Sequence, residues 1–195
     1  LCAALALPLG ADVLVLSDGP RHPSGRMQVF FGVRGGAEVE LTVYGPIRPL
    51  HSGHYGNWAP NPAAMLTRLL SAMRDEDGRV LIPGFHDDVR PLTPAEKRVL
   101  AELPDVETAL KRDLGLGRTE GTERLADSIA RPALNLRGLR AGDVGEGAAN
   151  AIPTGARASI DFRLVPDQTP ERVRERTEAF MRAQGWHVVG EEPDA

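Results

Sequence analysis

Residues 37–45 read Ala37-Glu38-Val39-Glu40-Leu41-Thr42-Val43-Tyr44-Gly45, with an apolar side chain at every second position. Because successive side chains of a strand point to opposite faces, this alternation predicts a strand with one buried and one solvated face. The apolar stretch 28–34 precedes it and is separated from it by Gly35 and Gly36. Two glycines form an acceptable hairpin turn, so we expect the two stretches to pair as a β-hairpin.

The last third of the chain returns to strand patterns. Residues 133–139 and 156–166 are predicted strands, and residues 186–190 are a predicted closing strand. Thr169 and Pro170 begin a helical pattern that continues to Gly185.

Between these strands and residues 37–45, the sequence predicts a helix over residues 62–74, with Asn61 as its cap. The resulting order is strand, helix, strand, strand, helix, strand, which is the ferredoxin-like βαββαβ order. A further segment, residues 92–131, begins at a Thr93–Glu96 capping box and carries a moderately apolar helical pattern. We therefore expect an α+β fold, an α/β sandwich, with a helical insertion after its first helix.

Composition narrows the function classes. The chain has 195 residues, of which 42% are hydrophobic and 26% are charged, as in a globular protein. A net charge of −4 does not favour binding to nucleic acid or to an anionic membrane. No apolar run approaches the roughly 20 residues that a membrane helix needs. The single cysteine excludes an intrachain disulfide and fits a reducing cytoplasm.

The most site-like stretch is residues 50–62, which combines histidines, glycines and aromatic residues in one loop. Imidazole groups donate, accept or ligate near neutral pH, and glycine permits close approach of the backbone to a ligand. His51 and His54 have no convincing third ligand in the sequence, so a self-contained metal site is not favoured. The glycine-rich residues 145–150 imitate a dinucleotide fingerprint, but no strand leads directly into them and Pro153 follows.

Two further polar residues have competing interpretations. Asp18 follows a short apolar strand, residues 12–16, where α/β enzymes place ligands and catalytic groups. The alternative is an ordinary Asx turn before Gly19 and Pro20. Arg163 lies in an alternating strand, where an arginine is by default a residue of the solvent face.

Four short motifs occur in a characteristic order along the chain: residues 15–19, 50–53, 150–153 and 162–166. Together they closely resemble the di-zinc metallopeptidases of the carnosine dipeptidase, aminoacylase and succinyl-diaminopimelate desuccinylase clan, and the dipeptidase branch above all. The resemblance covers most of the chain and is weakest from residue 82 to residue 131.

The resemblance implies roles for four residues. Asp18 matches a ligand of one of two zinc ions. His51 matches a histidine of the lid domain that reaches the active site of the partner subunit and stabilises the oxyanion. Asn150 matches a polar residue near the substrate. Arg163 matches the arginine that holds the substrate's terminal carboxylate, for which a guanidinium fork is well suited. His54 receives no catalytic role, and packing against Tyr55 or Trp58 is expected.

The same resemblance implies a domain organisation. Residues 33–190 form the lid, or dimerisation, domain, with the insertion at about 92–131. Residues 1–32 are the end of the first catalytic-domain segment, and residues 191–195 begin the return to that domain. We expect the chain to be part of a larger zinc-dependent dipeptidase or N-acyl-amino-acid hydrolase that forms a homodimer through this domain.

The family's other metal ligands and its general base are not found in this sequence. One carboxylate cannot hold two zinc ions, so the chain alone is expected to bind no zinc and to be inactive. Manganese and cobalt also suit carboxylate and imidazole ligands. Two alternatives stay open: a non-catalytic ferredoxin-like self-association module, and a degenerate family member that has lost its zinc ligands. The substrate, a small peptide or an N-acyl amino acid, is not specified further.

Overall fold

The computed structural model describes residues 21–27 and 32–193. The chain divides into two compact units, residues 1–31 and residues 32–195. In the first unit, the described residues include one turn, in which the Gly25 N–H donates to the His22 carbonyl at 2.8 Å. The predicted strand 12–16, Asp18 and residues 28–31 of the predicted hairpin lie outside the described residues.

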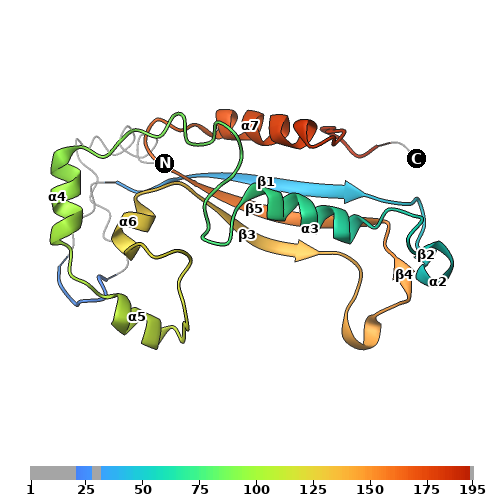
Figure 1. Ribbon diagram of the computed structural model, residues 1–195, viewed down its shortest axis with the longest axis horizontal. Coiled ribbons are helices and arrows are strands. Elements are labelled where there is room, and N and C mark those ends of the chain that lie inside the picture. The colour runs from blue at the N-terminus through green and yellow to red at the C-terminus, as the bar shows by residue number, and fades with distance from the viewer. Residues whose placement is uncertain (1–20, 28–31, 194–195) are drawn as a thin grey trace, which may run out of the picture. The chain divides into compact units, whose positions relative to one another are not determined.

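The second unit is built on an antiparallel sheet of three strands in the order β1-β5-β3 (Figure 1). These strands are β1 (Gly35–Tyr44), β3 (Ala133–Arg140) and β5 (Gly155–Leu164). β1 and β5 follow the predicted alternation, which places Ile160 and Phe162 of the central strand in the core, whereas β3 is mostly exposed beyond Leu134 and its register shifts between Leu136 and Gly138. The predicted α+β class and these strands are confirmed.

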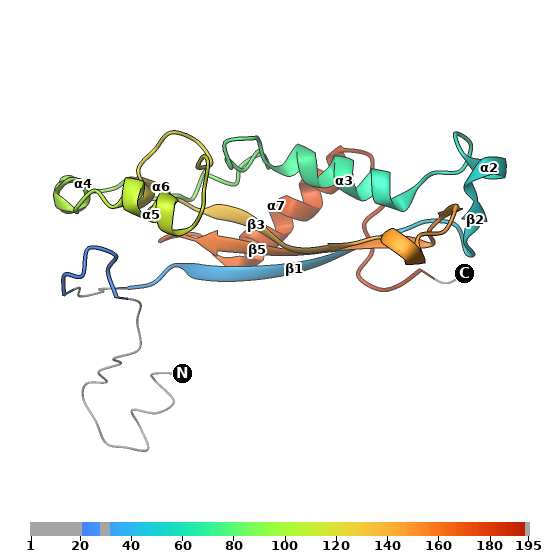
Figure 2. The ribbon, with the colours of Figure 1, turned by 90° about the horizontal axis from the view of Figure 1, so that it is seen from below.

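Two helices, α3 (Pro62–Met73) and α7 (Pro170–Ala183), cover the same face of the sheet (Figure 2). Each begins at the predicted cap: the Asn61 side chain accepts from the Ala63 N–H, and the Thr169 hydroxyl accepts from the Arg172 N–H. Their buried side chains meet the apolar face of β1 and β5 in one core. The opposite face of the sheet is polar, with Arg157 and Arg163 of β5 exposed on it.

The predicted hairpin turn at Gly35 and Gly36 is wrong. Both glycines belong to β1, where they pair with Leu164 and Arg163 of β5. A Cβ atom at Gly35 would lie 3.3 Å from the Leu164 Cβ, so the missing side chain permits close approach of the two strands. The long ladder with β5 therefore overrides the local turn signal.

The predicted closing strand at residues 186–190 is also wrong, because that segment is not a strand. Trp186 and Val188 instead pack against the core as partly buried side chains. The segment lines a groove together with residues 40–44 of β1 and forms no ladder with that strand. Three of the four strands of the expected βαββαβ order are present, in the arrangement of a ferredoxin-like sheet.

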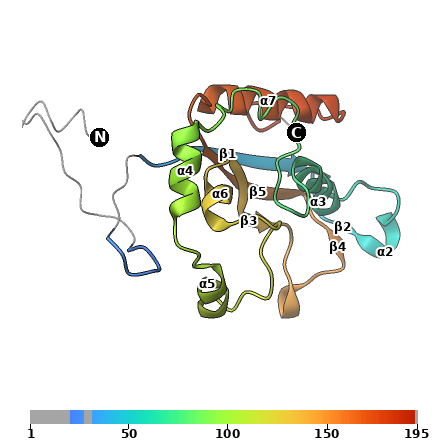
Figure 3. The same ribbon diagram turned by 60° about the vertical axis from the view of Figure 1, so that its left-hand side comes forward.

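The predicted insertion is helical and contains α4 (Pro94–Glu102), α5 (Glu107–Asp113) and α6 (Leu125–Ile129) (Figure 3). The capping box at its start is confirmed. The Thr93 hydroxyl accepts from the Glu96 N–H at 3.2 Å, and the Glu96 carboxylate accepts from the Thr93 N–H at 2.7 Å. Among the described residues, no helix is long and apolar enough to cross a membrane.

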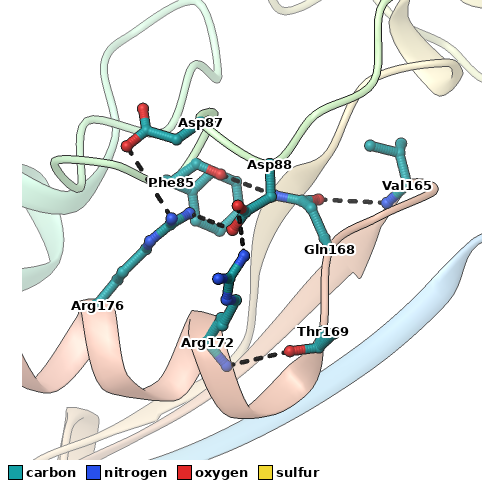
Figure 4. A network of polar contacts seen from close by, with 8 residues as sticks. All are labelled: Phe85, Asp87, Asp88, Val165, Gln168, Thr169, Arg172 and Arg176. Carbon is teal, nitrogen blue, oxygen red and sulfur yellow. Dashed lines mark hydrogen bonds and ion pairs between the residues drawn. The ribbon is translucent and has the colours of Figure 1, made fainter.

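A polar network ties the start of α7 to the segment that follows α3 (Figure 4). The Asp88 carboxylate pairs with Arg172 at 2.6 Å and with Arg176 at 2.9 Å. The Gln168 side chain donates to the Phe85 carbonyl at 2.8 Å. Because Phe85 is fully buried, these contacts fix the entry of α7 against the core.

A second, smaller sheet lies beyond one end of the main sheet. It pairs β2 (Leu50–His51) with β4 (Ala151–Ile152) and leads into the one-turn helix α2 (Ser52–Tyr55). The 3-10 turn Gly145–Gly147 precedes β4. This small sheet joins two loops that are about a hundred residues apart in the sequence, and it was not predicted.

Candidate functional site

The small sheet brings two of the expected site residues together. His51 pairs with Ala151 in the ladder, and the Ser52 N–H donates to the Asn150 carbonyl at 2.9 Å. Both His51 and Asn150 are exposed. The loop that carries the histidine and the loop that carries the asparagine are therefore held as one structural unit.

The backbone of its own loop orients the His51 imidazole. The Gly53 N–H donates to the His51 Nδ1 at 3.0 Å, which makes that nitrogen an acceptor. In the neutral ring the proton then resides on Nε2, because the hydrogen bond at one ring nitrogen sets the tautomer at the other. His51 therefore presents an N–H donor, which is the group that stabilising a developing oxyanion requires.

The other aromatic residues of this loop extend from His51. The His54 ring lies against the His51 ring, with centroids 4.7 Å apart and an interplanar angle of 33°. His54 also meets Tyr55 edge-on at 6.5 Å, which confirms the expected packing, and Tyr55 lies 6.1 Å from Trp58. The contact between the two histidines was not expected from the sequence.

Two glycines of the loop are required by close approach. A Cβ atom at Gly53 would lie 2.9 Å from the His51 Cε1 and would displace the imidazole. A Cβ atom at Gly56 would lie 2.5 Å from the Ser52 carbonyl oxygen, to which the Gly56 N–H donates. Glycine thus allows the backbone to fold tightly around the histidine.

Arg163 lies at the far end of β5, beside a buried carboxylate. Its Nε donates to the Asp161 Oδ2 at 2.9 Å, and Asp161 is only 6% exposed. Arg163 itself is exposed. The aspartate thus holds one edge of the guanidinium and leaves the rest available to a ligand.

Arg34, which the sequence analysis did not single out, lies close to this pair. Its Nη1 donates to the Arg131 carbonyl at 3.4 Å. Partial burial lowers the pKa of Arg34, the neighbouring Arg163 guanidinium lowers it further, and Asp161 opposes both effects. No sequence pattern indicates this contact, because it depends on the register of three strands.

The two groups of site residues lie at opposite ends of the sheet. Arg163 is the eighth residue after Gly155, which lies near the small sheet, and eight steps correspond to roughly 26 Å along a strand. Figure 1 shows the small sheet at one end and α4 to α6 at the other. No single side chain spans such a distance, so within one chain His51 and Arg163 cannot contact the same small molecule.

The described residues do not form a metal centre by themselves. They contain no group of three or more His, Cys, Asp or Glu side chains that could hold a metal ion. His51 and His54 are adjacent, but no third ligand joins them. Asp18, the expected zinc ligand, lies outside the described residues. These residues therefore do not fit a zinc site on their own.

Comparisons with known proteins agree with the fold. The family model of the M20 peptidase dimerisation domain matches residues 31–187. The Cys-Gly metallodipeptidase dug1 of Schizosaccharomyces pombe is 29% identical over 84% of this chain and 35% of its own length. The Beta-Ala-His dipeptidase of Homo sapiens is 27% identical over 86% of this chain and 34% of its own length. The chain thus spans about a third of the length of these relatives.

Solved structures give the same result. The M20 family metallo-carboxypeptidase Sso-CP2 from Sulfolobus solfataricus superposes with a TM-score of 0.77 at 33% identity, over 87% of this chain and 45% of that one. Human carnosine dipeptidase 1 shares the fold, with a TM-score of 0.68 at 22% identity over 78% of this chain and 34% of its own. From the family match and the shared fold, the chain belongs to the family of M20 peptidase dimerisation domains.

Proposed function

We propose that this chain is the dimerisation, or lid, part of a metal-dependent dipeptidase or N-acyl-amino-acid hydrolase whose active site combines residues of two subunits. In this proposal His51 and Asn150 complete the active site of the partner subunit, whereas Arg163 binds substrate beside its own catalytic domain. The observation that carries the proposal is the separation of these residues. They lie at opposite ends of one sheet, so only two copies of the chain can bring both to one small substrate.

Each residue suits its proposed task. Arg163 is held at Nε by Asp161 and offers its remaining donors to the terminal carboxylate of a peptide or N-acyl amino acid. The Nε2–H of His51 stabilises the negative charge that develops on the scissile carbonyl oxygen. Asn150 is linked to the His51 loop through Ser52, which supports its proposed contact with the same substrate.

The proposed metal cofactor is a pair of zinc ions, which belongs to the intact protein. The relatives named above are metallodipeptidases and a metallo-carboxypeptidase, which supports a metal in general. Asp18 is the residue of this chain proposed as a ligand. In this proposal the described residues contribute to substrate and transition-state binding, and they contain no group of three or more side chains that could hold a metal by itself.

The proposed dimer contact is the outer edge of β3. Both β1 and β3 lack an outer strand partner among the described residues, but residues 185–193 line a groove beside β1, and no such segment is seen along β3. Leu136 and Leu139 of β3 are exposed hydrophobic side chains at this edge. An open edge with apolar side chains is a template for pairing with a second copy of the same edge.

Subunit complementation in the intact protein tests the shared site. His51→Ala and Arg163→Ala homodimers are each expected to lose turnover while their metal content stays normal. When the two variants are co-expressed, random pairing leaves about a quarter of the active sites with both residues intact, so about a quarter of wild-type turnover returns. No recovery, with heterodimers demonstrated, would contradict a site shared between subunits. Wild-type turnover in both single variants would remove the assignment of both residues.

Asn150→Ala provides a matched control for this experiment. Because Asn150 and His51 belong to the same loop unit, both lesions affect the partner's site, and co-expression of these two variants restores no intact site. Gly53→Ala is expected to behave like His51→Ala, since the added Cβ displaces the imidazole. Recovery between His51→Ala and Asn150→Ala would place the two residues in different sites.

The interface is tested by placing a charge on the β3 edge. Leu139 is 57% exposed, and Leu139→Lys is expected to convert the dimer to monomer in light scattering at micromolar concentration. Leu116 in the insertion is similarly exposed, at 47%, and Leu116→Lys is the control that should remain dimeric. If Leu139→Lys remains a dimer of unchanged stability, the β3 edge is not the dimer interface. If the intact wild-type protein is a dimer but shows no peptide turnover at all, the non-catalytic self-association module is favoured.

A further inference from the structure

We infer that Arg34 is a second carboxylate-binding residue, so that the terminal carboxylate of the substrate is held between the guanidinium groups of Arg34 and Arg163. This inference rests on the proposed function of Arg163 and adds a specificity-determining residue to it.

The topology places Arg34 at the same end of the sheet as Arg163. Arg34 immediately precedes β1, Arg131 lies shortly before β3, and β5 lies between those two strands. Because the Arg34 Nη1 donates to the Arg131 carbonyl, the Arg34 side chain extends from the β1 side to the β3 side of the sheet. It therefore crosses the end of β5, where Arg163 is located.

A second contact shows where the Arg163 guanidinium lies. A Cβ atom added at Gly36 would be 3.9 Å from the Arg163 Nη1, so this nitrogen lies over Gly36, two residues from Arg34. The Nε edge of Arg163 points to Asp161. The Nη donors of Arg163 are thus on the side of the strand from which Arg34 crosses.

The charges at this end do not balance among the described residues. The Asp161 Oδ2 pairs with Arg163, and the charge of Asp161 also acts on the Arg34 guanidinium. Arg131 is paired with Glu123, and Arg34 forms no ion pair with a carboxylate of the described residues. Because Asp161 pairs with Arg163 and Arg34 has no carboxylate partner among the described residues, one positive charge is in excess, and an incoming carboxylate compensates for it.

Two guanidinium groups also explain what such a site would select. A free carboxylate accepts hydrogen bonds at both oxygens and carries a full negative charge, so it can satisfy both arginines. A carboxamide carries no charge and brings an NH2 group that faces two donors. Arg34 is therefore expected to increase the preference for substrates with a free terminal carboxylate over the corresponding amides.

The test is a comparison of kcat and KM in the intact protein for one dipeptide and its C-terminal amide. In Arg34→Met, KM for the dipeptide is expected to rise roughly tenfold or more, with kcat little changed and the carboxylate preference reduced by the same factor. Arg34→Lys keeps the charge but not the fork, and should recover part of the loss. The Lys variant also keeps the test valid if the Met variant folds poorly.

Arg157→Met is the matched control, because Arg157 is an exposed arginine on the same strand and the same face of the sheet as Arg163. It should leave the preference unchanged, which separates a local contact from general surface charge. Arg163→Met, assayed in parallel, separates the proposed role of Arg163 from the inferred role of Arg34. If it abolishes the preference and Arg34→Met does not reduce it, the inference about Arg34 is overturned and the role of Arg163 stands. If neither variant affects the preference, both assignments fail.

Discussion

Two regions of the molecule combine arginines with one aspartate, and they do so differently. In the network of Figure 4, the Asp88 Oδ1 pairs with Arg172 at 2.6 Å and the Oδ2 pairs with Arg176 at 2.9 Å. At the end of β5, Asp161 pairs with Arg163 at 2.9 Å through a single oxygen. The first aspartate uses both oxygens for two arginines, and the second anchors one arginine by its Nε edge.

The difference concerns which guanidinium donors remain for a ligand. Arg176 is 23% exposed and is committed to the aspartates that precede α7, so its role is to hold that helix. Arg163 is exposed, and Arg34 beside it has a backbone carbonyl as its partner. The same residue types therefore stabilise the fold where both carboxylate oxygens are paired, as in Asp88. They form a candidate ligand site where guanidinium donors remain unpaired, as in Arg163.

The largest expected effect is a loss of activity on substitution of Arg163, which would distinguish the end of β5 from the Asp88 network by function. Arg163→Met is expected to lower kcat/KM in the intact protein, with a loss of transition-state stabilisation of about 2–5 kcal/mol, because it removes a desolvated contact to the substrate carboxylate. Its free energy of unfolding, measured in urea, should fall by only about 1–2 kcal/mol, because Arg163 is exposed but the buried Asp161 loses its partner. Arg172→Met is the counterpart and should leave kcat/KM unchanged. A loss of stability in Arg163→Met as large as its loss of activity would mean that both regions are structural.

A smaller effect is expected from the saturated aspartate. Asp88→Asn removes the charge that two arginines share, and it should reduce the free energy of unfolding by about 1–3 kcal/mol. Activity per folded molecule should stay at the wild-type level. Asp87→Asn is the neighbouring control, with a change below about 0.5 kcal/mol, because its carboxylate lies 4.0 Å from Arg176 and is largely exposed. Equal effects of the two variants would contradict the role given to Asp88.

Within that network the two arginines should differ. Arg176 is 23% exposed and faces both Asp87 and Asp88, whereas Arg172 is 57% exposed and pairs with Asp88, so Arg176 loses more water on folding and depends more on its ion pairs. Urea unfolding should show a loss of about 1 kcal/mol for Arg176→Met and less than about 0.5 kcal/mol for Arg172→Met. The reverse order would show that exposure does not rank these contacts.

The smallest effect concerns a third arrangement, a simple surface pair. Arg90 hydrogen-bonds to Glu96 and lowers the pKa of Glu96 from 4.5 to about 2, with a contribution from the Thr93 N–H. Because the folded state lowers this pKa, the charged carboxylate favours the folded helix above pH 4.5, and that contribution is lost as the pH falls towards 2.

Amide exchange in α4 is the corresponding measurement. Protection of the first turn of the helix should decrease as the pH falls from 4.5 to 2, after correction for the intrinsic exchange rate. Glu96→Gln removes the titrating group, and its protection should be independent of pH in this range. If the wild-type and the Gln variant show the same pH profile, the cap is insensitive to the charge of residue 96.

The sequence predicts the main sheet and its helices well, because their signals are periodic. The alternation of β1 and β5 and the caps at Asn61 and Thr169 are local features that the fold preserves. The two errors occur where packing decides. Gly35 has the local signal of a turn but pairs with β5, and residues 186–190 have the signal of a strand but only pack against the core.

The candidate site could be predicted only in part. His51, Asn150 and Arg163 were assigned from a family resemblance, and the spacing of these residues gives no distance between them. Their division between two ends of a sheet follows from the β2–β4 pairing, whose two-residue strands carry no periodic signal. Arg34 was missed because its neighbours, Arg131 before β3 and Arg163 in β5, are far from it in the sequence.

The exposed Trp58 gives the loop of His51 a built-in optical reporter. Its side chain is 79% exposed, whereas Trp186, the other tryptophan of the chain, is packed against the core. Replacing Trp186 with Phe would leave a single indole a few residues from the imidazole. The emission of that indole would move to shorter wavelength when a neighbouring subunit covers the loop, so association could be followed in real time without a label.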